Sequence, residues 1–343
     1  MKYSIAHSLL AACALALSAC AAQKVPDNAL PALHIDAKRV SVAGLSSGAY
    51  MATQAQLAYP EIFRNAALVS GGPFGCAQGK IETALGTCMK GAPAPDVAAL
   101  AQRARERADR GEIGALKNLA GAKVYVLHGK SDPVVAENVA QAAADFYTAL
   151  KGVEPAATLD VVFDNQRDFS HTLPTEATGS DCNKVEKPFL GKCGFDAAGA
   201  IFATLYGAAP RAVAAPAGEL HRFDQNAFKP GGADAFLADN GYVYVPPACA
   251  QGKACGVLVA LHGCQQNADS VGEAFVRDAG FNRWADVYDV AVLYPQTRVN
   301  YTPLNPKACW DWFGYSGANY DSRDGVQLRW LTNALAALGV PRR

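Results

Sequence analysis

The sequence lacks an excess of charge of either sign. It holds 31 Lys and Arg residues against 31 Asp and Glu residues, so its formal net charge is zero. Proteins whose main partner is nucleic acid or an anionic surface usually carry a basic surplus. The balance therefore argues against both kinds of partner. With half of its 343 residues hydrophobic, the chain suits one large α/β core instead.

Long apolar runs are also missing. The run from Ile5 to Leu17 is too short to span a bilayer. It follows Lys2 and precedes Leu17-Ser18-Ala19-Cys20, which resembles the lipobox of bacterial lipoproteins. We therefore expect residues 1–20 to be a lipoprotein signal peptide and Cys20 to be the lipidated first residue of one mature domain, 21–343. The alternative is an ordinary signal peptide cut near Ala19 to Ala21.

Both readings of the N-terminus predict an exported protein. No aspartate follows Cys20, because the next two residues are alanines. Within the lipobox resemblance this favours sorting to the outer membrane, so we expect an outer-membrane lipoprotein that meets the membrane only through its lipid. A secreted or periplasmic protein is the alternative.

The cysteines lack the C-x-x-C spacing of many metal sites, so no metal is expected. Of ten cysteines, eight remain after Cys13 and Cys20 are set aside, and an even number in an exported protein implies disulfides. The sequence alone does not fix their connectivity. Local spacing suggests Cys76 with Cys88, Cys182 with Cys193 and Cys249 with Cys255, which leaves Cys264 and Cys309 for each other.

The sequence does contain a G-x-S-x-G segment, Gly44 to Gly48, between a predicted strand and a predicted helix. The β-branched run Val40 to Val42 predicts a strand before it, and helix formers from Ala49 to Tyr59 predict a helix after it. Strand, sharp turn and helix are the setting of a nucleophile elbow, which would expose the Ser46 hydroxyl. The Ser47 amide would then point at a developing oxyanion. The alternative is a glycine-rich strand–helix connection without a catalytic role.

An acid and a histidine follow at comparable positions. Asp132 ends the apolar strand that begins at Lys123, and His171 lies in a loop after the next predicted strand. Alternating strands and helices predict a doubly wound parallel sheet, in which reactive groups gather at the carboxyl ends of the strands. The order Ser46, Asp132, His171 is that of α/β-hydrolases, with His171 as the base and Asp132 orienting it.

Each member of this triad has a competing explanation. Asp132 precedes a proline and could simply form a turn. His128, on the same segment, is a rival base, although its place before a glycine at a strand end indicates a structural role. The remaining histidines of the mature chain, His34, His221 and His262, are not followed by a suitable loop.

Further segments make the resemblance to a known family specific. The chain resembles the single-domain, circularly permuted polyhydroxybutyrate (PHB) depolymerases of the esterase/depolymerase group. The resemblance rests on residues 44–51 (GLSSGAYM), 128–132 (HGKSD), 170–175 (SHTLPT), 205–207 (LYG), 261–266 (LHGCQQ) and 309–313 (CWDWF). These segments are spread along almost all of the chain after the signal, from residue 44 to residue 313, although a lipid anchor is unusual for an enzyme that acts on external granules.

The resemblance implies an α/β-hydrolase fold with Ser46, Asp132 and His171 as the triad. It also implies an oxyanion hole formed by the amides of Ser47 and Cys264. Trp310, together with Trp312, would form an aromatic wall beside the bound ester, with a core position as the alternative.

The strand that ends in His262-Gly263 comes more than two hundred residues after Ser46, whereas in an ordinary α/β-hydrolase it comes early. The last predicted helix, which ends near Leu338, would also run naturally into the strand that begins near Ile35. Both features indicate circular permutation, in which the oxyanion strand follows the triad.

The sequence thus predicts a monomeric serine esterase that needs no cofactor and acts on poly(3-hydroxybutyrate) or its oligomers. A feruloyl or acetyl esterase, or another polyester hydrolase, is the alternative within the same class, because loop shape decides the substrate. In a different class, the chain would be a non-catalytic lipoprotein that binds polymer.

Overall fold

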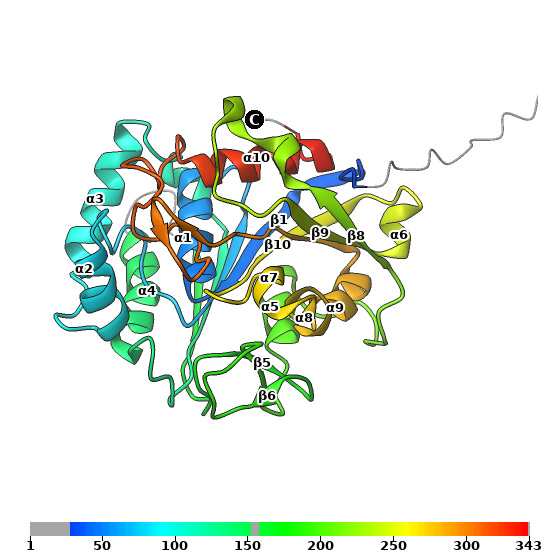
Figure 1. The fold of residues 1–343 in the computed structure, drawn as a ribbon, viewed down its shortest axis with the longest axis horizontal. Coiled ribbons are helices and arrows are strands. Elements are labelled where there is room, and N and C mark those ends of the chain that lie inside the picture. Colours follow the sequence, from blue (N-terminus) through cyan, green and yellow to red (C-terminus); the bar gives the residue numbers. More distant parts are fainter. Residues whose placement is uncertain (1–27, 152–157, 342–343) are drawn as a thin grey trace, which may run out of the picture.

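The computed structural model describes residues 28–151 and 158–341, so the predicted signal peptide and Cys20 lie outside the described residues. Its centre is an eight-stranded sheet in the order β4-β3-β2-β1-β10-β11-β9-β8 (Figure 1). The six strands from β4 to β11 are parallel, whereas β9 and β8 are antiparallel to their neighbours. The prediction of a mainly parallel α/β sheet is confirmed.

The strands of this sheet are short except for the central one. They are β1 Ile35–Leu45, β2 Asn65–Val69, β3 Lys123–Leu127, β4 Asp160–Asp164, β8 Glu219–Asp224, β9 Asn240–Val245, β10 Cys255–Leu261 and β11 Val290–Tyr294. Small strands outside the sheet are β5 Leu173–Thr175, β6 Ser180–Asp181, β7 Leu190–Lys192, β12 Asn300–Tyr301 and β13 Leu304–Asn305.

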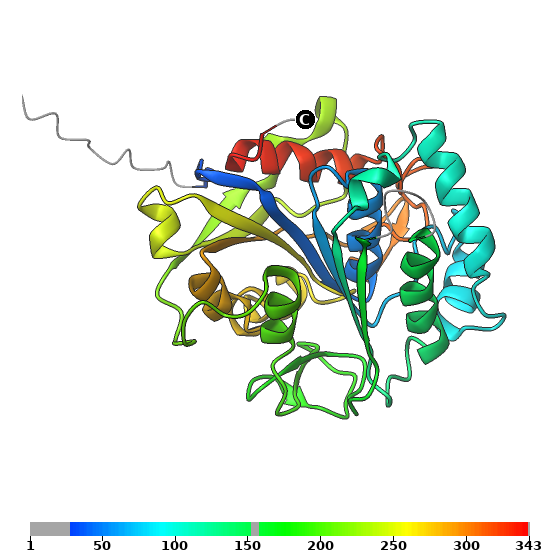
Figure 2. The same cartoon turned by 180° about the vertical axis from the view of Figure 1, so that it is seen from behind.

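Helices cover both faces of the sheet (Figures 1 and 2). One face packs against α1 Ser47–Ala58, α3 Val97–Asp109, α4 Glu137–Leu150 and α10 Val326–Leu338, and the other against α5 Ala197–Tyr206, α8 Ala274–Asp278 and α9 Phe281–Tyr288. Side chains of β1 alternate between the two cores, Val40 and Val42 on one face and Ala43 and Leu45 on the other. This alternation is the period of two that a strand buried on both faces requires.

The structure corrects three details of the sequence prediction. Residues 73–95 are rich in glycine and proline, which predicts a loop, but they contain α2 Ile81–Leu85 and the π-helical turn η1 Gly86–Lys90. The sequence predicts one helix near Phe275 to Ala285, but the structure has two, because Gly280 takes φ 87° between them. Residues 207–219 are rich in alanine, proline and glycine and predict a linker, and strand β8, which begins at its last residue, is not predicted. The remaining short helical segments are α6 Pro247–Ala250, α7 Ala268–Val271, η2 Leu116–Leu119, η4 Gln225–Phe228 and η5 Pro230–Gly232.

Four disulfides join the predicted pairs, Cys76–Cys88, Cys182–Cys193, Cys249–Cys255 and Cys264–Cys309. The start of β1 and the end of α10 lie side by side, because the Leu33 N–H donates to the Leu338 carbonyl at 2.8 Å. Over the described ranges, no helix is both long and apolar enough to cross a membrane.

Candidate active site

Ser46 occupies a strained turn between β1 and α1. Its backbone angles, φ 56° and ψ −119°, lie in a region that side-chain-bearing residues rarely adopt. The turn is possible because the two flanking positions, which have no room for a side chain, are glycines. A Cβ on Gly44 would lie 2.2 Å from the Gly48 carbonyl oxygen, and one on Gly48 would lie 2.3 Å from the Leu261 carbonyl oxygen. This is the close strand–helix crossing of a nucleophile elbow.

Asp132 and His171 form a buried hydrogen-bonded pair. His171 Nδ1 lies 2.8 Å from Asp132 Oδ2, so the N–H donates to the carboxylate. Asp132 Oδ1 accepts the backbone N–H groups of Val134 at 2.8 Å and Val135 at 3.0 Å. Burial alone would raise the pKa of Asp132, but the hydrogen bond and charge of His171 outweigh it and the pKa is lowered. The carboxylate is therefore ionised and able to orient the imidazole.

Three of the four other described histidines have contacts that indicate structural roles. His128 is buried at the end of β3, and burial lowers its pKa. His262 is buried as well, its Nδ1 lies 2.7 Å from the Gly263 carbonyl oxygen, and burial lowers its pKa to about 4. His221 is paired at the surface with Glu219.

Ser46 and His171 line one cavity of about 700 Å³. This volume is typical of pockets for small organic ligands. Asp132 supports His171 from behind, with a side chain that is fully buried. Most of the remaining wall is apolar, from Leu45, Tyr50, Ile81, Leu85, Met89, Val134, Val135, Val185, Phe189, Pro303, Leu304, Pro306, Trp312 and Phe313. Ser46 and His171 thus share a largely hydrophobic cavity.

Two backbone N–H groups, of Ser47 and Cys264, are available at this cavity. Both residues line it, and within residues 28–151 and 158–341 neither N–H has a hydrogen-bond acceptor in the protein. The segment that carries Cys264 is fixed on both sides, because the Gly263 N–H donates to Gln266 Oε1 at 2.8 Å and the Gln265 N–H to the Lys307 carbonyl at 2.7 Å. Unpaired N–H groups beside a nucleophile are what an oxyanion hole requires.

The two tryptophans do not share a wall as predicted. Trp312 lines the cavity and stacks on Tyr50 with ring centroids 4.9 Å apart. Trp310 is fully buried in the main core, with its ring 5.6 Å from that of His262, and does not line the cavity. The prediction that Trp310 contacts substrate is wrong, because the segment that holds both residues is not an extended strand.

Asp311 explains this course of the chain, and the sequence analysis missed it. Its buried carboxylate accepts the backbone N–H groups of Phe313, Gly314, Tyr315 and Ser316 at 2.7–3.3 Å. Burial raises the pKa of Asp311, and these donors oppose the rise. The carboxylate folds part of the long aromatic loop, residues 296–320, into a turn and so presents Trp312 to the cavity. The signal was an acid followed by Gly314 and Ser316, which favours a turn.

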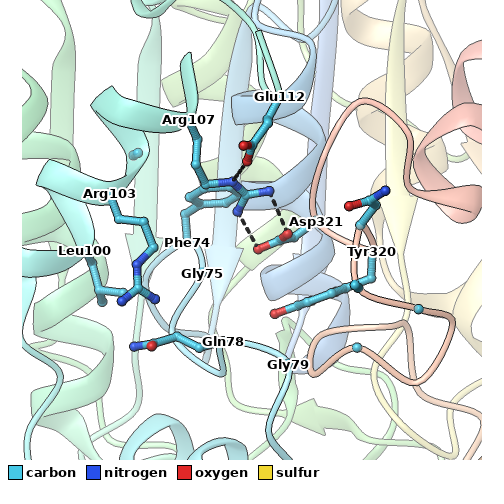
Figure 3. A pocket seen from close by; sticks show the side chains of 15 residues that line it. Phe74, Gly75, Gln78, Gly79, Leu100, Arg103, Arg107, Glu112, Tyr320 and Asp321 are labelled. Atoms are coloured by element: carbon cyan, nitrogen blue, oxygen red, sulfur yellow. Dashed lines mark hydrogen bonds and ion pairs between the residues drawn. The ribbon is translucent and has the colours of Figure 1, made fainter. Parts of the chain in front are cut away.

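A second hollow, of about 590 Å³, is lined by α3 and the far part of the aromatic loop (Figure 3). It contains none of the predicted triad. Arg107 grips Asp321 through two hydrogen bonds of 2.9 Å, also binds Glu112, and lies over the ring of Phe74. Since its charge is matched by two carboxylates, Arg107 serves to fasten the aromatic loop to α3.

No cluster of three or more His, Cys, Asp or Glu side chains that could hold a metal ion occurs in the described parts of the chain.

Comparison with known proteins gives a consistent result. A family model described as "Esterase PHB depolymerase" matches residues 13–161 and 240–337. A poly(3-hydroxybutyrate) depolymerase of Delftia acidovorans is 36% identical over 96% of this chain, which spans 65% of that relative's length. A polyhydroxybutyrate depolymerase of Talaromyces funiculosus is 33% identical, with 91% of this chain and 93% of the relative covered.

A similar structure has also been solved. The crystal structure of PHB depolymerase from Penicillium funiculosum matches with a TM-score of 0.80 and 31% identity, over 91% of this chain and 98% of that one. A second matching structure, also with a TM-score of 0.80, is a PHB depolymerase variant complexed with an R3HB trimer.

Proposed function

Because this chain belongs to the esterase PHB depolymerase family, we propose that it is a serine esterase that hydrolyses poly(3-hydroxybutyrate) or its oligomers through an acyl-enzyme on Ser46. The observation that carries the proposal is the elbow serine and the Asp132-supported His171 on one apolar cavity. No metal or organic cofactor takes part in this scheme.

The proposed reaction has two halves. Ser46 Oγ attacks the ester carbonyl carbon while His171 Nε2 takes the hydroxyl proton, and Asp132 stabilises the resulting imidazolium. The N–H groups of Ser47 and Cys264 hold the negative carbonyl oxygen. The tetrahedral intermediate then expels the alcohol, which receives its proton from His171. Water, deprotonated by His171, attacks the acyl-enzyme in the same way and releases the acid and Ser46.

The rim of the cavity supports a water-insoluble substrate. Leu304 is 65% exposed and Leu85 52% exposed, and Ile81 and Val185 beside the cavity are exposed as well. Large apolar side chains gathered at one opening are typical of a binding surface. A polyester surface would cover them, whereas a feruloylated sugar would leave most of them in water. The solved relative in complex with an R3HB trimer supports the same substrate class.

The finer proposals on location and organisation rest on the sequence and the disulfides. Four disulfides support export. We propose that Cys20 carries a lipid, that residues 21–343 are one monomeric catalytic domain, and that the domain is held at the outer membrane. Replacement of Cys20 by serine should release the membrane-bound form, and cell fractionation with mass spectrometry tests this. Unchanged fractionation, with no acyl mass on the wild type, would indicate an ordinary signal peptide.

We also propose that the fold is a circular permutation of the ordinary α/β-hydrolase order. The hydrogen bond between Leu33 and Leu338, and the place of β10 beside β1, support it. Joining the ends by a short linker and opening the chain within the largely exposed residues 207–218, before the edge strand β8, should give an active enzyme if this is right.

The experiment that tests the catalytic proposal compares Ser46→Ala with Ser47→Ala. Ser46→Ala should abolish hydrolysis of a chromogenic short ester and of hydroxybutyrate oligomers without unfolding the protein, whereas Ser47→Ala keeps its amide and should remain active. Substantial activity in Ser46→Ala would refute the nucleophile assignment, and an inert wild type would indicate a non-catalytic binding protein. Product analysis on poly(3-hydroxybutyrate), its oligomers and feruloylated sugar identifies the substrate.

A further inference from the structure

The turn η1, Gly86–Lys90, connects two parts of the proposed machinery that are far apart in sequence. On one side the Tyr50 hydroxyl, on α1 one turn after Ser46, donates to the Cys88 carbonyl. The Cys76–Cys88 disulfide fixes the same residue to the preceding loop. On the other side the Met89 carbonyl accepts the Ala136 N–H at 2.8 Å, just after the turn that carries Asp132.

Lys90 makes the more informative contacts. Its ammonium group donates to the Pro133 carbonyl oxygen at 2.9 Å and to the Val134 carbonyl oxygen at 3.3 Å. These two carbonyls belong to the peptide groups whose N–H groups, on Val134 and Val135, donate to Asp132 Oδ1. Two peptide groups thus lie between the Lys90 cation and the Asp132 anion, with oxygen toward the lysine and hydrogen toward the aspartate.

This arrangement strengthens the two backbone hydrogen bonds to the Asp132 carboxylate. A cation at the carbonyl end of a peptide group polarises it, so the N–H at the other end becomes a better donor. The same contacts restrain the turn itself, since both carbonyls are held by one ammonium group. The orientation of the Asp132 carboxylate, and through it the His171 ring, therefore depends on a side chain that touches neither.

We propose that Lys90 is a positioning residue of the triad, which acts on Asp132 through the peptide groups 133–134 and 134–135. The inference rests on the proposed serine-esterase function. Lys90 lies outside the motifs that the sequence analysis used, and no substrate contact is needed for this role. The Cys76–Cys88 disulfide and the Tyr50 hydroxyl keep the turn in place for it.

The test compares Lys90→Met with Lys90→Arg and with a control, Lys117→Met, at an exposed lysine on η2 away from the cavity. Initial rates are measured on a soluble short ester, with thermal unfolding alongside. Lys90→Met should lower kcat about five- to tenfold with KM within about twofold, which is below the ~10²-fold that a misplacement of about 1 Å can cost. Lys90→Arg should restore most of the rate, because it keeps a cationic donor, and Lys117→Met should match the wild type.

Three results would overturn the inference. The first is a wild-type kcat in Lys90→Met. The second is an increase in KM alone, which would make Lys90 part of the cavity wall. The third is an equal loss of kcat in Lys90→Met and Lys90→Arg together with a lowered Tm, which would make the role of Lys90 structural. Ser46→Ala is assayed in parallel. If Ser46→Ala is inactive and Lys90→Met is normal, only this inference fails; if Ser46→Ala is active, the proposed function fails and this inference with it.

Discussion

Trp312 should decide how tightly long substrates bind, and the structure offers a matched control for it. Trp312 is 7% exposed and lines the cavity, whereas Trp310, two residues earlier, is 0% exposed and lies in the core. Replacement of each by alanine removes the same indole group. Only Trp312→Ala removes it from the wall that a bound oligomer would contact.

The expected size of the effect follows from the lost contact area. Because Trp312 is 7% exposed, it offers only about 20 Å² of a surface of roughly 250 Å² to a bound chain, which buries about as much of its own surface against it. About 40 Å² at ~25 cal/mol per Å² is about 1 kcal/mol, or about fivefold in kcat/KM for an oligomer. A short acyl ester that reaches only Ser46 should lose less than about threefold, since it does not need the wall.

Trp310→Ala should behave differently. Removal of a fully buried aromatic side chain costs about 3–5 kcal/mol of folding free energy, which lowers Tm by roughly 6 °C in a domain of this size. Any loss of activity should then be equal for the two substrates.

The assay is the ratio of initial rates on a soluble hydroxybutyrate trimer and on a short chromogenic ester, with the unfolding temperature measured for each variant. An unchanged ratio in Trp312→Ala, or a changed ratio in Trp310→Ala, would refute the placement of the substrate wall.

Three further changes test other parts of the site. Cys309→Ala should lower turnover on a short ester by loosening the Cys264 amide, by less than the ~10²–10³-fold loss of an entire oxyanion donor; a wild-type rate would contradict this. Gly48→Ala would place a Cβ 2.3 Å from the Leu261 carbonyl oxygen, so it should destabilise the fold by at least the ~1–3 kcal/mol that overpacking costs and lower Tm accordingly. An unchanged Tm would refute the close crossing of β1 and α1. Because the pKa of Asp132 is lowered by folding, its ionised form stabilises the fold above pH about 4 and the gain disappears as the pH falls through the lower, folded-state pKa. Urea unfolding below pH 4 should therefore show a steeper loss of stability in the wild type than in Asp132→Asn, and parallel curves would contradict it.

The parts of the site that short motifs encode could be predicted from the sequence. Ser46 needs two glycines at fixed positions for a turn that no other residues permit, and Asp132 and His171 end or follow buried strands whose apolar runs are visible. The disulfides were predictable because three of the four close short segments of 6–12 residues.

The parts that depend on long-range side-chain contacts could not be predicted. The family resemblance placed Trp310 and Trp312 on one aromatic wall, but Asp311 binds the N–H groups of residues 313–316 and folds the chain into a turn there. Lys90 contacts residues more than forty positions away, and nothing in residues 86–90 indicates that. Short segments such as η1 also give too few residues for a periodic pattern.

The length of strand β1 determines how far the cavity of the enzyme would lie from its point of attachment to a membrane. Its 11 residues, at about 3.3 Å each, separate the Ser46 end from the Ile35 end by about 36 Å. The chain enters the domain at the Ile35 end, next to the end of α10, whereas the apolar rim with Leu85 and Leu304 surrounds the cavity at the other. A lipid on Cys20 would thus tether the domain on the side opposite the cavity. The cavity end of the domain could then contact a solid polymer particle while the Ile35 end stays attached to the membrane. Hydroxyacids would be released at a distance from the membrane of about one domain's width.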